Sequence, residues 1–274
     1  MANNQCSRGS ALVAAIFALL LVVLTFSTIY FFAARTWWFP ESITSLGQAI
    51  DAQFVRTLWI TGVVFLLAQL ALAYVLLRFY DRGGRAHYSH GNTTMEILWT
   101  AATAILFVGL GIAAESAWAA YHSQPASPNP VVIRVVAQQF QWNFHYPGPD
   151  GRFGRTAPEL VEDGLGNFVG LDRSDPAAVD DLVTPIMAAP VGREVVLDLM
   201  SKDVTHSLFI RELRFKQDAV PGLVIRLRFT AVKVGDYEIA CAELCGLGHH
   251  RMRSVLKVLS PEEYEAWLVE QAVE

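Results

Sequence analysis

The residues best suited to chemistry are two cysteines, a histidine and a methionine in one short stretch near the C-terminus. Cys241 and Cys245 are four positions apart, and His249 and Met252 follow within seven residues of the second cysteine. Thiolate, imidazole and thioether are soft donors, and such a set selects copper over magnesium or calcium. A mononuclear blue-copper site uses one cysteine, whereas two thiolates can bridge a pair of copper ions, each with one imidazole and one weak axial donor.

A paired copper site needs a second histidine from elsewhere in the chain. His206, in the sequence Asp-Val-Thr-His-Ser at 203–207, is the candidate, because this segment lies at the end of a predicted strand. On the residues alone, two other interpretations stay open. Two exported cysteines this close can form a disulfide, and two cysteines with two histidines can hold a structural zinc ion. The methionine at its fixed spacing and the Gly-Leu-Gly linker at 246–248 favour copper.

The composition indicates what kind of chain carries this cluster. Of the 274 residues, 53% are hydrophobic and only 17% are charged, which excludes a disordered or collagen-like protein and indicates that part of the chain lies in lipid. Residues 123–274 carry 15 basic and 21 acidic side chains, a balance of −6. An acidic half argues against nucleic acid as a partner and favours a basic partner or a plain solubility role.

The N-terminal part, residues 1–122, is predicted to be a transmembrane region. A membrane-spanning helix needs about 20 residues, and three stretches without charge approach or exceed that length. They cover residues 10–34, 57–77 and 97–114. The first stretch exceeds the roughly 7–15 apolar residues of a signal peptide, so we expect it to be retained as a span rather than removed as a leader.

The orientation of these spans follows from the basic residues that flank them. The segment 78–94, after the second span, contains Arg78, Arg82 and Arg85 with a single acid, Asp81, which predicts that this loop faces the cytoplasm. Arg8 predicts the same side for the N-terminus. Everything after about residue 122 is therefore expected on the outer face of the membrane.

The exported half, residues 123–274, shows short β-branched and aromatic runs broken by Gly, Pro and Asp, as is typical of a β-sandwich or small barrel. Strands are predicted over residues 131–146, 193–200, 207–216, 223–230, 236–242 and 253–259. The stretch 147–186 is predicted to be a long acidic insertion between strands, with a solvated loop as its simplest role. Residues 261–271 are predicted to form a terminal helix capped by Ser260.

Together these features resemble subunit II of the haem-copper cytochrome c oxidases. The stretch from Cys241 to Met252, with the pattern Cys-x-Glu-x-Cys-x3-His-x2-Met, reproduces that family's signature for its dinuclear copper centre, CuA. The segment 203–207 is similar to the strand that supplies the other histidine. Residues 216–222 and 90–100 are similar to the linking stretch and to the start of the last transmembrane helix. The resemblance covers residues 55–270 and implies a membrane-anchored chain whose helices precede a cupredoxin-like β-sandwich.

The resemblance also implies roles for individual residues. Both cysteines would bridge the two coppers, each histidine would bind one ion, the methionine would be axial, and the glutamate would donate its backbone carbonyl. The carboxylate of Glu243 would reach a magnesium ion shared with subunit I. The implied metal ligands are His206, Cys241, Glu243, Cys245, His249 and Met252.

Three further residues, Glu96, Phe140 and Trp142, carry expectations. Glu96 resembles the acid at the mouth of a proton path into subunit I, with a simple helix-end glutamate as the alternative. Where the family often has Gln-Trp-x-Trp-x-Tyr, this chain has Phe140 in place of the first tryptophan, the residue that usually receives electrons. We predict that Trp142 takes over part of that route; a place in the sandwich core is the alternative. The family usually has two spans, so the first of the three is extra or a leader.

The function that the resemblance implies is an electron relay, with no catalytic residue on this chain. Electrons from cytochrome c or a similar donor would reach CuA and pass to haem in subunit I, where oxygen is reduced to water and protons are translocated. The expected location is a bacterial plasma membrane, with the C-terminal domain on the periplasmic face. Two alternatives stay open: the CuA subunit of a nitric oxide reductase, and a membrane-anchored copper chaperone.

Overall fold

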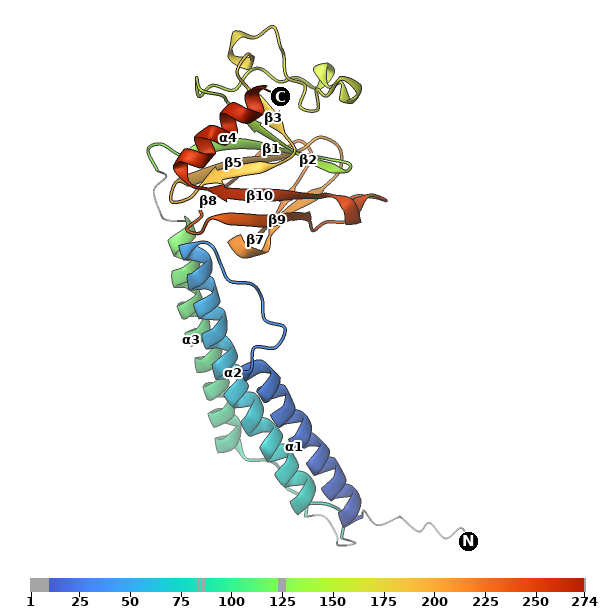
Figure 1. Ribbon diagram of the computed structural model, residues 1–274. Coiled ribbons are helices and arrows are strands. Elements are labelled where there is room, and N and C mark those ends of the chain that lie inside the picture. Colours follow the sequence, from blue (N-terminus) through green and yellow to red (C-terminus); the bar gives the residue numbers. More distant parts are fainter. Residues whose placement is uncertain (1–9, 83, 85–86, 123–126, 274) are drawn as a thin grey trace. The chain divides into compact units, whose positions relative to one another are not determined.

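The computed structural model describes residues 10–82, 84, 87–122 and 127–273 (Figure 1). They form two compact units. A helical unit contains the chain up to Phe39 and Asp51–Ala119, and a β unit contains Pro40–Ile50 and the chain from Ala120 onward. Arg8 and Arg85, on which the predicted orientation partly depends, lie outside the described residues. The predicted division at residues 122 and 123 stays a prediction, and the structure adds the segment Pro40–Ile50 to the β unit.

The helical unit contains three helices that are long and apolar enough to cross a membrane, as predicted. The second and third helices extend beyond their stretches without charge, because the second also contains Asp51 and Arg56 and the third has Glu96 in its first turn. Charged side chains near helix ends can reach the membrane surface and need no apolar surroundings. The helices are α1 (Ala11–Ala33), α2 (Ser45–Arg78) and α3 (Thr93–His122).

The β unit is a sandwich of two five-stranded sheets, as predicted. The first sheet has the order β3-β2-β1-β5-β8 and the second β4-β10-β9-β6-β7, with parallel pairing of β1 with β5 and of β4 with β10. Side chains from both sheets form one apolar core. The strands are β1 (Val131–Gln138), β2 (Gln141–Tyr146), β3 (Leu182–Thr184), β4 (Met187–Pro190), β5 (Glu194–Ser201), β6 (His206–Ile210), β7 (Phe215–Ala219), β8 (Ile225–Thr230), β9 (Gly235–Cys241) and β10 (Arg253–Leu259).

Two of the predicted strands are each broken in two. The predicted strand 131–146 is a hairpin in which Gln138 pairs with Gln141, so Gln139 and Phe140 form its turn. The predicted strand 207–216 is interrupted by the 3-10 turn Arg211–Leu213, which ends at Arg214 in the left-handed region with φ 61°. Periodicity alone does not show such breaks, because the apolar alternation continues on both sides of each turn.

The acidic insertion has a folded core of its own. Val169, Leu171 and Ala178 are buried together with Val136 of β1, and Met200 of β5 packs against them, so the insertion covers one face of the first sheet. It also carries β3 and three 3-10 turns. A buried hydrogen bond between His145 Nε2 and Asp181 Oδ2, at 2.7 Å, ties its end to β2. It is therefore more than the solvated loop that its composition suggests.

A second feature that the sequence pattern did not predict is the docking of the α1–α2 connection onto the β unit. Ile43 is 1% exposed and belongs to the main core. Its backbone N–H donates to the carbonyl of Glu212 at 2.9 Å, and its carbonyl accepts from the N–H of Val232 at 2.8 Å. Glu41 forms an ion pair with Lys233 at 2.8 Å. Residues 41–44 thus add a short strap to the sandwich.

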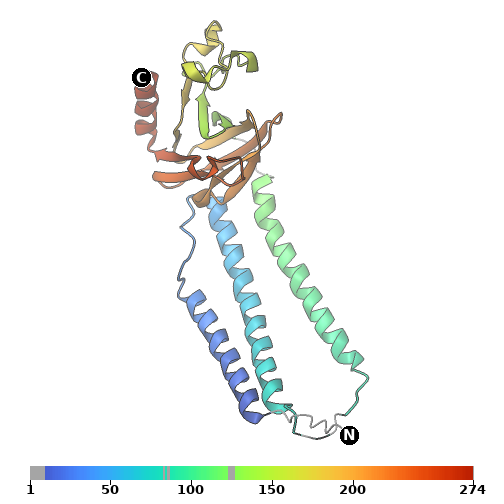
Figure 2. The same ribbon diagram turned by 90° about the vertical axis from the view of Figure 1, so that its right-hand side faces the viewer.

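The terminal helix α4 (Pro261–Val273) packs against the sandwich beside β3, β4 and β10 (Figure 2). Ser260 Oγ accepts from the N–H of Glu263 at 3.2 Å, and the Glu263 carboxylate accepts from the N–H of Ser260 at 3.0 Å. This reciprocal pair is a capping box, and it confirms the predicted cap. Tyr264 and Trp267 are buried, and the Trp267 ring lies 5.6 Å from that of Tyr146.

Candidate metal centre

The second sheet positions the predicted ligands at one end of the sandwich. Leu208 of β6 pairs with Cys241 of β9, and alternate residues of a strand share a face, so His206 projects from the same face as Cys241. The base of the loop between β9 and β10 is closed by two hydrogen bonds. Cys241 N–H donates to the Met252 carbonyl at 3.1 Å, and Ala242 N–H donates to the Ser207 carbonyl at 3.0 Å. The strands therefore fix both ends of the loop.

One half of the site centres on the first cysteine. Cys241 Sγ lies 4.0 Å from His206 Nδ1 and 3.2 Å from the backbone carbonyl oxygen of Glu243. The 3-10 turn His249–Arg251 and the residue that follows it supply the other half. Cys245 Sγ lies 3.6 Å from His249 Nδ1 and 3.9 Å from Met252 Sδ. Each cysteine thus has one imidazole and one weak donor of its own.

The two halves meet at the sulfurs, because Cys241 Sγ and Cys245 Sγ are 3.9 Å apart. A disulfide requires about 2.05 Å, and both cysteines are free. Two ligands at about 2.0–2.3 Å from one tetrahedral ion lie roughly 3.3–3.8 Å apart, close to the separations found in both halves. The donor set therefore fits metal ions held between the ligands, and its soft chemistry fits copper.

Burial protects this donor cluster from water. His206 and Met252 are fully buried and Cys245 nearly so, whereas Cys241 and His249 are half-buried. Burial, followed by the proximity of Cys241, raises the pKa of the Cys245 thiol to about 11. This thiol therefore keeps its proton at neutral pH until a metal displaces it.

The orientation of His206 is set by Asp203. The carboxylate Oδ1 of Asp203 lies 2.8 Å from His206 Nε2, which leaves Nδ1 directed at Cys241. Burial alone would raise the pKa of Asp203, but hydrogen bonds from the Gln139 N–H, His206 and the Val204 N–H outweigh it and lower that pKa. An ionised carboxylate behind a metal-binding imidazole fixes its tautomer and increases its basicity.

The turn between β1 and β2 contacts both halves of the site. Gln139 N–H donates to Asp203 Oδ2 at 2.7 Å, and the Gln139 side-chain amide donates to the Cys245 carbonyl. Sequence reasoning gave no role to Gln139 or Asp203. The available signal was the spacing of Asp203 three residues before His206, while the contact of Gln139 with the loop crosses 106 residues and leaves no trace in local pattern.

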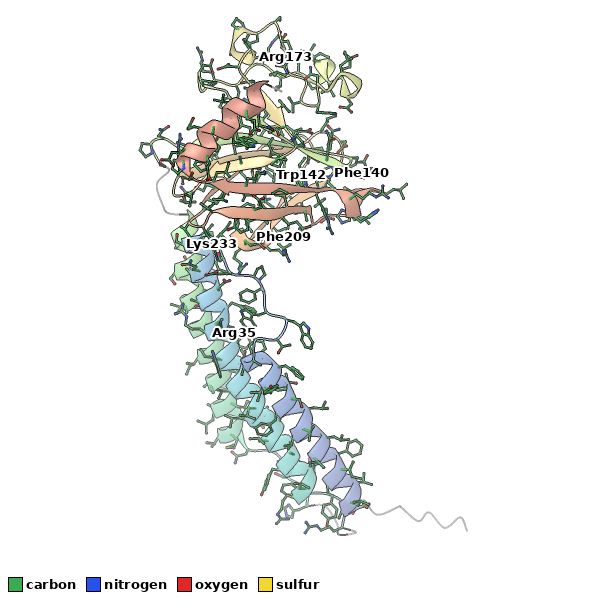
Figure 3. The ribbon with its side chains drawn as sticks, in the orientation of Figure 1. Arg35, Phe140, Trp142, Arg173, Phe209 and Lys233 are labelled. Atoms are coloured by element: carbon green, nitrogen blue, oxygen red, sulfur yellow. The ribbon has the colours of Figure 1, made fainter. Side chains whose placement is uncertain are left out.

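The two aromatic candidates are placed differently, and Figure 3 labels both. Phe140 is 38% exposed in the hairpin turn. Trp142 is 1% exposed, its ring lies 6.3 Å from that of His206 in an edge-on arrangement, and its Nε1 has no hydrogen-bond partner within the described part of the chain. Trp142 therefore belongs to the core and also neighbours a predicted ligand. Its role in electron transfer stays a prediction.

Two predicted roles concern side chains that are not members of the donor cluster. Glu96 lies in the first turn of α3, in the helical unit. Asn92 caps this helix, because its Oδ1 accepts a hydrogen bond from the Met95 N–H at 3.2 Å. The side chain of Glu243 is half-buried, and its magnesium role stays a prediction. The loop also exposes two apolar side chains, Leu244 and Leu247, the latter 97% exposed.

Comparisons with known proteins agree with this architecture. Residues 131–259 match the family model described as "Cytochrome C oxidase subunit II, periplasmic domain". The "Alternative cytochrome c oxidase subunit 2" of Bradyrhizobium diazoefficiens is 34% identical over 262 residues, which cover 93% of this chain and 91% of the relative. The cytochrome c oxidase subunit 2 of Thermostichus vulcanus is 30% identical over 83% of this chain and 76% of the relative. That of Cereibacter sphaeroides is 31% identical over 78% and 72%.

Proposed function

The chain belongs to the cytochrome c oxidase subunit II family, and from this premise we propose that its metal centre is a dinuclear copper site, CuA, that relays electrons to haem in subunit I. Membership implies a multi-pass membrane protein with a periplasmic cupredoxin-like domain, associated with subunit I in a haem-copper oxidase. The observation that carries the proposal is the division of six donors into two sets of one cysteine, one imidazole and one weak donor.

The proposed ligands are those that the sequence pattern predicts. Cys241 and Cys245 would hold the copper pair through their thiolates, and the imidazoles of His206 and His249, the Met252 thioether and the Glu243 carbonyl would complete the ligand set. When bound, a copper pair with shared thiolates spreads one electron over both ions, so electron transfer needs little change in geometry. The protein's contribution is to hold the donors on closed strand ends, to exclude water with the buried His206 and Met252, and to orient His206 through Asp203.

The surface around the loop suits the arrival of a redox partner. Leu244, Leu247 and Phe140 are exposed apolar side chains at the edge of the proposed copper site, and the exported half has an excess of acidic residues. We expect a basic cytochrome c or a similar donor to dock there, guided by opposite charge. Trp142, in contact with His206, is the proposed conduit behind that surface.

Three finer assignments belong to the same proposal. The Glu243 carboxylate would hold a magnesium ion together with subunit I. Glu96 lies at the mouth of a proton path into subunit I, consistent with its place in the first turn of α3. The complex resides in a bacterial plasma membrane, where the reduction of oxygen to water is coupled to proton translocation. A copper chaperone is a weaker proposal, because Met252 and His206 are fully buried and chaperones need exchangeable ligands.

The complex with subunit I provides the test. In the purified oxidase, reduced cytochrome c should be oxidised with consumption of oxygen, and Cys245→Ser should remove most of that activity while subunit I keeps its haem spectrum. A serine hydroxyl has too high a pKa to bridge two coppers. Reduction of nitric oxide in place of oxygen would identify the nitric oxide reductase alternative. Full oxygen consumption by the Cys245→Ser complex would contradict the relay.

A further inference from the structure

We propose that Gln139 and Phe140, the turn between β1 and β2, form a clamp that holds the copper-binding loop in its ligating shape. The inference rests on the proposed function. Both residues contact the middle of the loop, where the chain carries Gly246, Leu247 and Gly248. Strands fix the two ends of the loop, but the Gly-Leu-Gly segment lies between them, with Leu247 almost fully exposed. Turn hydrogen bonds within the loop, from the His249 N–H to the Gly246 carbonyl at 3.1 Å and from the Arg251 N–H to the Gly248 carbonyl at 2.9 Å, shape this segment, and contacts from outside the loop hold it against the sandwich.

Gly248 gives the most direct indication of the clamp. Its backbone has φ −88° and ψ 4°, a conformation open to any residue, so the backbone does not explain why glycine stands here. A Cβ at this position would lie 2.4 Å from Cγ and Cδ2 of the Phe140 ring. The ring therefore lies against the Gly248 backbone at a distance that only glycine permits.

Gly246 and Cys245 provide a second point of contact. A Cβ on Gly246 would lie 2.8 Å from Gln139 Nε2 and 3.1 Å from Phe140 Cε1. The Gln139 side-chain amide donates to the carbonyl of Cys245, the residue that carries one bridging sulfur. The turn thus holds the loop through one hydrogen bond and one aromatic face, on two neighbouring parts of the Cys245–His249 segment.

Gln139 also connects the two halves of the proposed copper pair. Its backbone N–H donates to Asp203, which in turn orients His206 of the strand half. Its side chain holds Cys245 of the loop half. One residue therefore sets the position of the loop relative to the strand that carries the other histidine. In this inference Phe140 and Gln139 are positioning residues, whether or not electrons pass through the Phe140 ring.

The test uses the full chain in detergent, loaded with copper. Two quantities are measured: the rate at which copper is lost to a chelator, and the copper hyperfine pattern in the EPR spectrum. Gly248→Ala should speed copper loss about 10–100-fold, the usual effect of disturbing groups behind metal ligands, and should change the hyperfine pattern. Gly164→Ala is the matched control, because a Cβ there meets nothing within 4 Å. The thermal unfolding midpoint reports whether each variant is folded.

The decisive comparison is the double variant Gly248→Ala with Phe140→Ala. Without the ring, the added methyl group has room, so copper loss should be no faster than in Phe140→Ala alone. Rates that multiply, as for independent sites, would overturn the clamp. If Gly248→Ala does not fold, Phe140→Leu provides the same test, because it removes the aromatic ring and leaves the backbone unchanged. Faster copper loss from this variant supports the clamp, and an unchanged rate overturns it.

The hydrogen bond is tested separately. Gln139→Leu removes the donor to the Cys245 carbonyl and should speed copper loss. Gln141→Leu should not, because the Gln141 side chain donates to Asn143 at 2.9 Å and not to the Cys245 carbonyl. Equal rates in the two variants would overturn that part of the clamp. A parent chain that binds no copper pair would contradict the proposed function itself, while a normal parent with unaffected variants would contradict the clamp alone.

Discussion

The two halves of the donor cluster are built on different kinds of structure. Cys241 and His206 lie on paired strands, and His206 is fully buried with its second nitrogen on Asp203. Cys245 and His249 lie on a loop that is fixed at its ends and contacted in its middle, and His249 is half-buried. The difference teaches that strand pairing fixes the backbone of one half directly, while the middle of the other half depends on contacts from the turn between β1 and β2.

Removal of each histidine should give the largest contrast between the halves. His206→Gly and His249→Gly should both lose the native copper spectrum. Added imidazole should restore much of the spectrum in His249→Gly, because that position reaches the surface, but little in His206→Gly, because that position is sealed in the core. EPR and optical titration with imidazole measure this, and equal rescue of both variants would remove the contrast.

The acidity of the loop thiol should make copper uptake depend on pH. Since burial raises the pKa of Cys245 to about 11, copper must displace its proton, and apparent affinity should rise with pH across the range 6–9. The stability of the metal-free fold should change with pH in the opposite direction, falling as pH rises. A raised thiol pKa adds stability to the metal-free fold below the ordinary thiol pKa, and that stability is lost as pH rises toward 11. Copper competition titrations at several pH values check the first effect, and a flat profile would contradict it.

The strand half should respond to the loss of its supporting carboxylate. Asp203→Asn keeps the shape of the side chain but removes the negative charge behind His206. We expect copper affinity to fall about 10–100-fold, with a change in the coupling of only one histidine in the EPR spectrum. Asp198→Asn, the same change at a carboxylate that pairs with Arg226 at 2.8 Å and not with His206, serves as the control. An equal disturbance of both histidines would show that the halves are not separable.

The smallest expected effect is at Trp142, which neighbours the strand half. If it conducts electrons, Trp142→Phe should slow reduction of copper by the donor with little loss of melting temperature. If it only fills the core, the variant should lower stability, as is usual when a buried aromatic side chain is trimmed, and leave the rate per folded molecule unchanged. Stopped-flow reduction and thermal unfolding of the same samples separate the two roles.

The sequence predicts the ligands better than it predicts what supports them. The spacing of Cys241, Cys245, His249 and Met252 places four donors in one loop, and the apolar stretches predict the three helices, because both signals are local. The strap at Ile43 is not predicted, since its partners Glu212 and Val232 lie about 170 and 190 residues away. The same distance in sequence hides the contact of Gln139 with Cys245. Short strands such as β3 and β4 contain too few residues for an alternating pattern.

Copper stoichiometry with EPR on the full chain, purified apart from subunit I and loaded with copper, tests the central claim most directly. Two donor sets whose sulfurs lie 3.9 Å apart, close enough to be shared by two ions, predict two coppers per chain and a mixed-valence spectrum with the unpaired electron spread over both ions. Cys245→Ser, measured alongside, should abolish that spectrum. One copper per chain with a four-line mononuclear signal, or zinc alone, would contradict the account.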